Sequence, residues 1–244
     1  QPNAIIDIGA NAGEWSKLVR QLYPTTKLLL LEATPKHEAT LQKVCTELGD
    51  SEFRIAVLSA KAFETVQFYQ SGNTGNSMFR ENTDHYKNDE SVKRTTTALD
   101  DQIETSFLKN EPIDIIKVDV QGAELVVLQG ATKTLEKASF VQFESGTIEY
   151  NAGGACLYHV DAYLRSHGFY WYDFGDPTHS KSFGTLGLGQ FDVLYVKPTS
   201  PRLPKEFREL NGTYGGAQQW NSVLFSSGSS SALYGLEETI RMEN

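Results

Sequence analysis

A glycine-containing turn near the beginning of the chain carries the clearest chemical signal. The turn, Asp7-Ile-Gly-Ala-Asn-Ala-Gly13, separates a short apolar run from an amphipathic segment. Glycine lets the backbone approach a ligand closely, and the N-terminus of a following helix favours an anionic group. Because the spacing is Gly-x-x-x-Gly, and not the Gly-x-Gly-x-x-Gly of dinucleotide sites, an amino-acid carboxylate is favoured over a pyrophosphate. Asp7 would meet the ammonium group of such a ligand directly or through water; the alternative is a tight turn capped by Asn11.

An acidic residue follows the second apolar run at a spacing typical of a ribose contact. Glu32 ends this run and lies about twenty residues beyond the glycine turn, the separation at which an acidic side chain reaches a ribose in such folds. Its carboxylate can accept hydrogen bonds from both ribose hydroxyls. Alone, Glu32 would be a solvated residue at a helix entry, but the preceding glycine turn favours ribose binding.

A third group of polar residues follows the strongly apolar run 113–118. It reads Lys117-Val-Asp119-Val-Gln-Gly122-Ala-Glu124. We expect Asp119 to project into the same cleft from a strand end, with a helix N-cap as the alternative. Gly122 permits a sharp turn, and Glu124 falls in the first turn of a helix, where an acid also favours the helix dipole.

These residues require strands that end at one edge of a sheet and helices that follow them. Apolar runs predict strands at 4–8, 27–31, 53–58, 113–118, 140–143, 169–172 and 191–196, with extended segments at 65–69 and 94–98. Apolar residues at helical spacing predict helices around 15–22, 41–48, 123–128 and 157–164. This alternation predicts an α/β fold with a mostly parallel sheet covered on both faces. No helix fits between the last two strands, so one of them should be antiparallel.

Composition and charge narrow the class of protein. The 244 residues are 39% hydrophobic and 22% charged, which is typical of a globular α/β protein. The net charge of -9 disfavours nucleic acid as a partner, because such binding depends on clustered Lys and Arg. No apolar run is long enough to span a membrane. The chain starts with Gln1 and shows no signal-peptide pattern, so an upstream segment could be missing. The two cysteines have no metal-ligand spacing, and Cys45 falls on an apolar helical face.

Several segments together resemble one family. Asp7-Ile-Gly-Ala-Asn-Ala-Gly-Glu, Leu31-Glu-Ala-Thr-Pro, Thr97-Ala-Leu-Asp-Asp and Lys117-Val-Asp-Val-Gln-Gly-Ala-Glu-Leu are similar, in order, to the FkbM-type methyltransferases. The resemblance covers roughly residues 4–197. It implies a Rossmann-like class I methyltransferase fold with a seven-stranded sheet, S-adenosylmethionine as cofactor, and O-methylation of a small molecule or sugar. Family members commonly have Glu where this chain has Gln121.

The resemblance also implies the residues of the cofactor site. Asp7, Gly9, Asn11, Gly13 and Glu32 should hold the cofactor, and we place their neighbours Ala10 and Ala33 there, together with Ser77 and Asp119. Residues 1–197 would form the methyltransferase domain and 198–244 a C-terminal extension of unknown role. Neither the oligomeric state nor the compartment follows from the sequence; a glycosylation-type triplet at Asn211 is weak evidence for secretion.

Methyl transfer to an oxygen also needs a base, a segment that excludes water from the cleft, and side chains that line the acceptor site. Glu144, at the end of the strand 140–143, and Asp119 are the best placed carboxylates; His159 is a weaker candidate. Alternatively, Asp119 and Glu144 would together hold a divalent cation. The polar loop 71–90, with Asn76 and Ser77, should cover the cleft and order on ligand binding. Aromatic residues could line the acceptor site or pack in the core: Tyr150, Tyr158, Tyr170, Trp171 and Tyr172.

Two other functions stay open at this point. A nucleotide-dependent oxidoreductase would need the dinucleotide glycine spacing that this chain lacks. A non-catalytic module that kept the cofactor fold would bind S-adenosylhomocysteine without methylating any acceptor. An RNA methyltransferase is disfavoured by the acidic composition.

Overall fold

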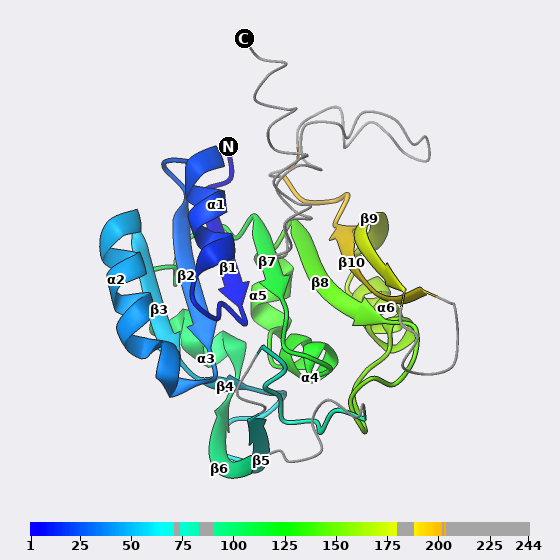
Figure 1. The fold of residues 1–244 in the computed structure, drawn as a ribbon. Coiled ribbons are helices and arrows are strands. Elements are labelled where there is room, and N and C mark those ends of the chain that lie inside the picture. Colours follow the sequence, from blue (N-terminus) through cyan, green and yellow to red (C-terminus); the bar gives the residue numbers. More distant parts are fainter. Residues whose placement is uncertain (71–73, 83–89, 180–187, 202, 204–244) are drawn as a thin grey trace.

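A computed structural model describes residues 1–70, 74–82, 90–179, 188–201 and 203 (Figure 1). Its main feature is a seven-stranded sheet with the order β3-β2-β1-β7-β8-β10-β9. The strands are β1 Ala4–Ile8, β2 Lys27–Glu32, β3 Ser51–Ile55, β7 Ile115–Val118, β8 Phe140–Gly146, β9 Tyr170–His179 and β10 Leu188–Val196. Neighbouring strands pair in parallel from β3 to β8, whereas β10 is antiparallel to both β8 and β9. The fold class and the antiparallel strand near the C-terminus are confirmed.

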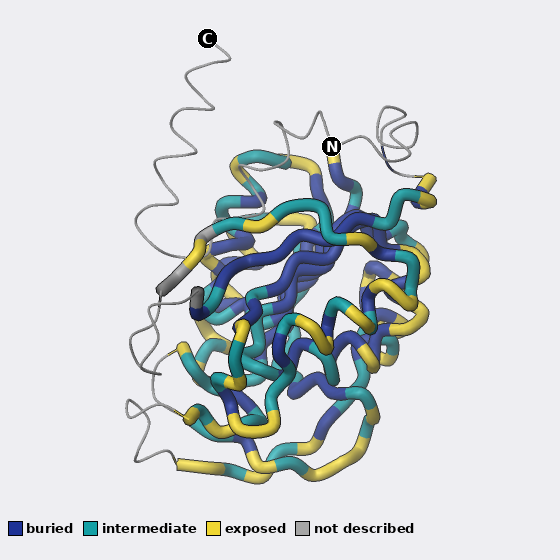
Figure 2. The backbone as a smooth tube through the Cα atoms, turned by 90° about the vertical axis from the view of Figure 1, so that its right-hand side faces the viewer, coloured by how far each residue is buried: buried dark blue, intermediate teal, exposed yellow. Residues whose placement is uncertain are grey.

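Helices cover both faces of this sheet. They are α1 Glu14–Leu22, η1 Pro35–His37, α2 Glu38–Leu48, α3 Leu99–Glu104, α4 Glu124–Gln129, α5 Thr132–Lys137 and α6 Leu157–Ser166. Because side chains alternate along a strand, Ile5 packs with α1 and α2, whereas Ile6 and Ile8 pack with α3 to α6. The central strands are buried along most of their length (Figure 2).

A second, three-stranded sheet departs from the prediction for residues 53–58. The chain leaves the main sheet after β3, where the Ala56 N–H donates to the Glu32 carbonyl (2.8 Å), and β4 Val57–Leu58 then pairs with β6 Glu90–Thr97. β5 Thr65–Gln70 pairs antiparallel with the other edge of β6. The prediction of a single strand at 53–58 was therefore wrong, because this apolar run contributes residues to strands of two different sheets.

Several predictions concern segments outside the described residues. These include parts of the loop 71–90, the glycine-rich stretch from Gly184, Asn211, and most of the extension 198–244. The division of the chain at residue 197 stays a prediction. Both cysteines are buried and free, as expected for small apolar side chains. In the described part of the chain, no helix combines the length and apolar character needed to cross a membrane.

Replacing Gly9 with Ala should destabilise the fold more than the same change at Gly168. Both residues have φ near +80°, at 79° and 80°, so both variants carry a left-handed strain of about 1–2 kcal/mol. A Cβ at Gly9 would also lie 1.8 Å from the Asp119 carbonyl oxygen, whereas at Gly168 the nearest atom is the flexible Lys197 Cε, 3.9 Å away. Overpacking adds about 1–3 kcal/mol. Urea unfolding measures both losses, and equal losses would contradict this close approach.

Candidate active site

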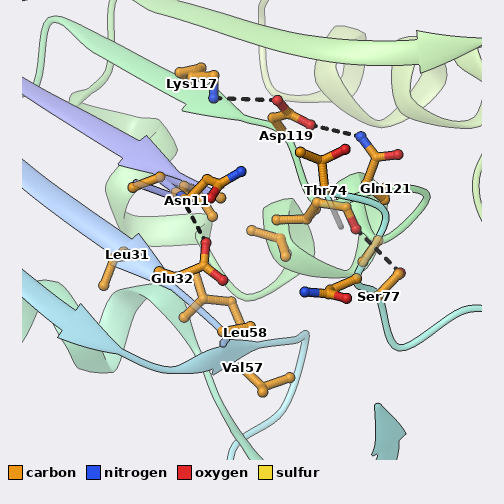
Figure 3. Close-up of a pocket in the computed structure, with 18 of the residues that line it drawn as sticks. Asn11, Leu31, Glu32, Val57, Leu58, Thr74, Ser77, Lys117, Asp119 and Gln121 are labelled. Atoms are coloured by element: carbon orange, nitrogen blue, oxygen red, sulfur yellow. Dashed lines mark hydrogen bonds and ion pairs between the residues drawn. The ribbon is translucent and has the colours of Figure 1, made fainter. Parts of the chain in front are cut away.

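A cavity of about 550 Å³ opens at the C-terminal ends of β1, β2, β7 and β8 (Figure 3). The strand order reverses here, between β1 and β7, which is where α/β folds bind their ligands. Most of the predicted site residues line this cavity: Gly9, Ala10, Asn11, Glu32, Ala33, Ser77, Asp119 and Glu144. Asp7 and Gly13 do not.

The glycine turn is held against the end of β2. The N–H groups of Gly9 and Ala10 both donate to the Leu31 carbonyl, at 2.9 and 3.1 Å. Asn11 has φ 49°, a left-handed conformation that Asn tolerates better than most residues. This conformation directs the Asn11 N–H to Glu32 and leaves the turn facing the cavity.

Glu32 is fixed by backbone groups on both sides. One carboxylate oxygen accepts from the Asn11 N–H (2.8 Å), and the other accepts from the Thr34 N–H (2.7 Å). The side chain lies at the cavity wall although the residue is only 8% exposed. Each carboxylate oxygen has a second lone pair, so Glu32 can still accept from two hydroxyl groups.

Asp7 lies behind the cavity rather than in it. The residue is fully buried, accepts a 2.7 Å hydrogen bond from the Ser16 hydroxyl, and lies 3.4 Å from Lys117 Nζ. Our expectation of a ligand contact from Asp7 is thus not met by this geometry, because its neighbours enclose the carboxylate. Asp7 instead positions the ammonium group of Lys117, which does line the cavity.

Lys117 is a site residue to which the sequence analysis assigned no role. Its Nζ lies 3.5 Å from Asp119 and 5.6 Å from the centre of the Trp15 ring. Burial alone would lower the pKa of Lys117, but Asp7, Asp119 and Asp192 raise it overall, so the group stays charged. A lysine inside a buried apolar strand was the signal that could have identified it.

Gly13 has a packing role that replaces the predicted ligand contact. It precedes α1 with φ 80°, and a Cβ there would lie 2.9 Å from Val44 Cγ1 of α2. Gly13 therefore allows α1 and α2 to pack closely, and it shapes the turn from the side away from the cavity.

The opposite end of the cavity is acidic. Asp119 follows β7 and Glu144 lies on β8, and the side-chain amide of Gln121 donates to both carboxylates, at 3.0 and 2.7 Å. Asp192 of β10 pairs in register with Glu144 and also lines the cavity. Neither Gln121 nor Asp192 was predicted as a site residue. Asp192 is distant in sequence from the other site residues, and only the antiparallel pairing of β10 with β8 brings it to the cavity.

Two carboxyl groups at this end have raised pKa values. Burial raises the pKa of Glu144 to about 8, and the charges of Asp119, Asp192 and Glu124 add to the effect. Burial raises the pKa of Glu124 to about 7, although the backbone N–H groups of Gly122 and Val120 donate to its carboxylate. Glu124 begins α4 as predicted, and it lines a small adjoining cavity together with Gln121 and Glu144.

The described part of the loop 71–90 lies over the end of β7. Thr74, Asn76, Ser77 and Met78 line the cavity. The Ser77 hydroxyl donates to the Val120 carbonyl (3.3 Å), and the Asn76 amide donates to the Thr34 hydroxyl (3.2 Å). The described part of this loop therefore contributes to the cavity wall, whereas its role as a cover and its ordering on ligand binding stay predictions.

For the five aromatic residues, the structure favours the alternatives to an acceptor wall in most cases. Tyr158 and Tyr170 are exposed at the surface. Trp171 stacks on Phe191 in the core, and Tyr172 packs against the apolar cluster on the other face of the sheet. Of the five residues, only Tyr150 approaches the site among the described residues, where it lines the small adjoining cavity.

The two remaining candidates for chemistry have different positions. The imidazole of exposed His159 accepts the Cys156 N–H at 3.2 Å, so it caps α6 as a surface residue. Within the described residues, no group of three or more His, Cys, Asp or Glu side chains has the arrangement of a metal site. The Gln121 amide bridges Asp119 and Glu144, the two carboxylates considered for a shared cation.

The fold and the site together define a Rossmann-like protein with a ligand cavity at the strand switch point. The family model described as "Methyltransferase FkbM domain" matches residues 7–170. The chain therefore belongs to the FkbM family of methyltransferases, in agreement with the sequence motifs.

Individual relatives are more distant. The curated 2-O-methyltransferase NoeI of Sinorhizobium fredii (strain NBRC 101917 / NGR234) is 28% identical over 163 residues, or 61% of this chain and 65% of NoeI. The match thus spans less than two thirds of the length of that relative. Among solved structures, M. capricolum TrmK in complex with S-adenosyl-homocysteine has a TM-score of 0.46 and 14% identity, covering 98% of this chain and 77% of TrmK. The precorrin-6y C5,15-methyltransferase of Geobacter metallireducens GS-15 has a TM-score of 0.44 and 10% identity, with 80% of each chain covered.

Replacing Glu144 with Gln should stabilise the protein at alkaline pH but not at acidic pH. A carboxyl group whose pKa is raised in the folded state keeps its proton longer there, so stability falls as pH rises from 4.5 to about 8. The amide removes this loss, which is on the order of 5 kcal/mol. Unfolding free energies of both proteins at pH 5 and pH 9 measure the effect. Glu136→Gln, at an exposed carboxylate on α5, is the control; a pH-independent difference for Glu144→Gln would contradict the assignment.

Proposed function

We propose that this chain transfers a methyl group from S-adenosylmethionine to a hydroxyl oxygen of a small-molecule or carbohydrate acceptor. One observation carries the proposal: a single cavity has a backbone-fixed carboxylate, Glu32, at one end and a carboxylate with a raised pKa, Glu144, at the other. The first suits a ribose, and the second suits the proton of a hydroxyl group.

The residues of the cavity fit this cofactor. Its volume lies within the range of small-molecule sites. Apolar side chains surround the end beyond Glu32 and suit a flat base: Leu31, Ala33, Ala56, Val57 and Leu58. Gly9 lines the cavity and packs so closely on the Asp119 backbone that no side chain fits there. Glu32 would hold the ribose, while the glycine turn and the Lys117–Asp119 pair would hold the amino-acid part.

The reaction needs alignment, exclusion of water and removal of one proton. When bound, S-adenosylmethionine supplies an electrophilic methyl group; the acceptor oxygen forms the new C–O bond while the S–C bond breaks and its electron pair stays on sulfur. Glu144 accepts the hydroxyl proton. A pKa near 8 suits a general base at neutral pH, because basicity and the ionised fraction are both appreciable there.

The comparisons support oxygen as the acceptor atom. NoeI carries the name of a 2-O-methyltransferase. The glycine spacing disfavours a dinucleotide, as an oxidoreductase would require. The cavity walls at the Glu144 end are polar and acidic, which favours a polyhydroxylated acceptor over an apolar or anionic one.

Glu32→Ala should weaken the binding of S-adenosylhomocysteine by about 1–3 kcal/mol, the contribution of hydrogen bonds to a charged acceptor. Isothermal titration calorimetry measures the affinity. Glu38→Ala removes the same charge from the exposed start of α2 and should bind normally. If Glu32→Ala kept wild-type affinity, Glu32 would not be part of the cofactor site.

Glu144→Gln should keep cofactor affinity and lose about 10²–10⁴-fold in kcat, because the amide cannot accept the acceptor proton. Asp119→Asn should lower both affinity and rate, because Asp119 belongs to the cofactor side of the cavity. A screen of polyhydroxylated acceptors with labelled cofactor must first identify a substrate. Near-normal turnover of Glu144→Gln would refute the base assignment, and binding without turnover on any acceptor would indicate a non-catalytic module.

A further inference from the structure

The side-chain amide of Gln121 occupies an unusual position between two carboxylates. Its Nε2 lies 3.0 Å from Asp119 Oδ1 and 2.7 Å from Glu144 Oε2, both hydrogen-bonding distances. An amide nitrogen has two N–H donors, so it can serve both acceptors at once. Gln121 lines the main cavity and also the small adjoining cavity behind it.

The backbone around Gln121 is held in a conformation that it would not adopt freely. Gln121 has φ 54° and Gly122 has φ 93°, so two consecutive residues are in the positive-φ region. A Cβ at Gly122 would lie 2.9 Å from Asn151 Cβ, and the Asn151 amide in turn donates to the Phe79 carbonyl (3.0 Å). Strain of this kind persists only where the surrounding structure enforces it, and it is common at functional sites.

The charges around Glu144 explain why a neutral donor is needed. Asp119 at the end of β7, Glu124 of α4 and Asp192 of β10 all place negative charge near this carboxylate. Lys117, a cation that lines the same cavity, pairs with Asp7 and Asp119. Without a donor between them, Asp119 and Glu144 would repel each other as soon as both were ionised.

We infer that Gln121 is a positioning residue: its amide holds the Asp119 and Glu144 carboxylates in one geometry and allows both to be ionised side by side. This inference rests on the proposed function, in which Glu144 is the base. The residue type follows from the geometry. Met has the same length and no donor, Asn is one methylene shorter, and a protonated Glu has a single O–H donor for two acceptors.

The test combines a titration with kinetics. Carboxyl ¹³C NMR of glutamate-labelled protein, with Glu144→Gln to assign the signal, reports the ionisation of Glu144 without any acceptor. In Q121M the midpoint of this titration should rise by about one pH unit, a tenfold change in proton affinity. With an acceptor, kcat at pH 7 should fall about tenfold or more, the pH–rate profile should shift upward, and KM should change little.

Two further variants keep the result interpretable. Q121E should restore one hydrogen bond only in its protonated form, so a second ionisation step should appear in the NMR titration. Q121N, expected to fold even if Q121M does not, should give a smaller shift than Q121M because it reaches one carboxylate. Q102M is the control: it removes an amide from α3, away from the cavity, and should leave the midpoint of the Glu144 titration unchanged.

The outcomes separate this inference from the proposed function. An unchanged Glu144 titration in both Q121M and Q121N would overturn the positioning role, whatever the activity. A shifted titration supports it even if no acceptor is found. Turnover that is unaffected by Glu144→Gln would instead overturn the proposed base and leave the titration result standing.

Discussion

The Lys117 ammonium group lies between the carboxylates of Asp7 and Asp119, buried at the ends of two neighbouring parallel strands. A buried charge is tolerated only when it is paired, and loss of one partner typically costs about 3–5 kcal/mol. Because Asp7 belongs to β1 and Lys117 to β7, this ion pair fixes the strand ends at the switch point relative to each other. The close passage of Gly9 over the Asp119 carbonyl lies directly beyond this ion pair, where the Asp119 N–H donates to the Ile8 carbonyl (3.0 Å).

The same arrangement divides the cavity into two electrostatic environments. Lys117 balances the charges on its own side, where the amino-acid part of the cofactor is proposed to lie. Glu144 lies beyond this cation, close to Asp119, Asp192 and Glu124, and its pKa rises as a result. A paired cation and a carboxylate surrounded by other carboxylates therefore follow from one strand order.

Features that depend on local pattern could be predicted, and features that depend on register could not. Apolar runs located the strands of the main sheet, and the spacing from the glycine turn to Glu32 located one wall of the cavity. The six-residue helices α3 and α5 were missed, whereas α4, which is equally short, was predicted from its continuous apolar run and the glycine that follows it. Asp7 and Gly13 were predicted at the ligand because the sequence shows no sign of their tertiary contacts. In the folded chain Asp7 pairs with Lys117, and Gly13 packs against Val44. Trp171 and Tyr172 were grouped as one wall although strand alternation sends them to opposite faces.

The antiparallel strand β10 contributes to the chemistry as well as to the sheet. It covers the outer edge of β8, so Glu144 is shielded from water on that side, and it places Asp192 directly opposite Glu144. A hydrated glutamate with an ordinary pKa would be ionised at neutral pH but too weakly basic to remove a hydroxyl proton efficiently. Burial and the neighbouring carboxylates, Asp192 of β10 among them, raise the pKa of Glu144, and the Gln121 hydrogen bond limits the increase. If Glu144 is the proposed base, its pKa is thus set by opposing effects from different elements, which together suit it to work near pH 7.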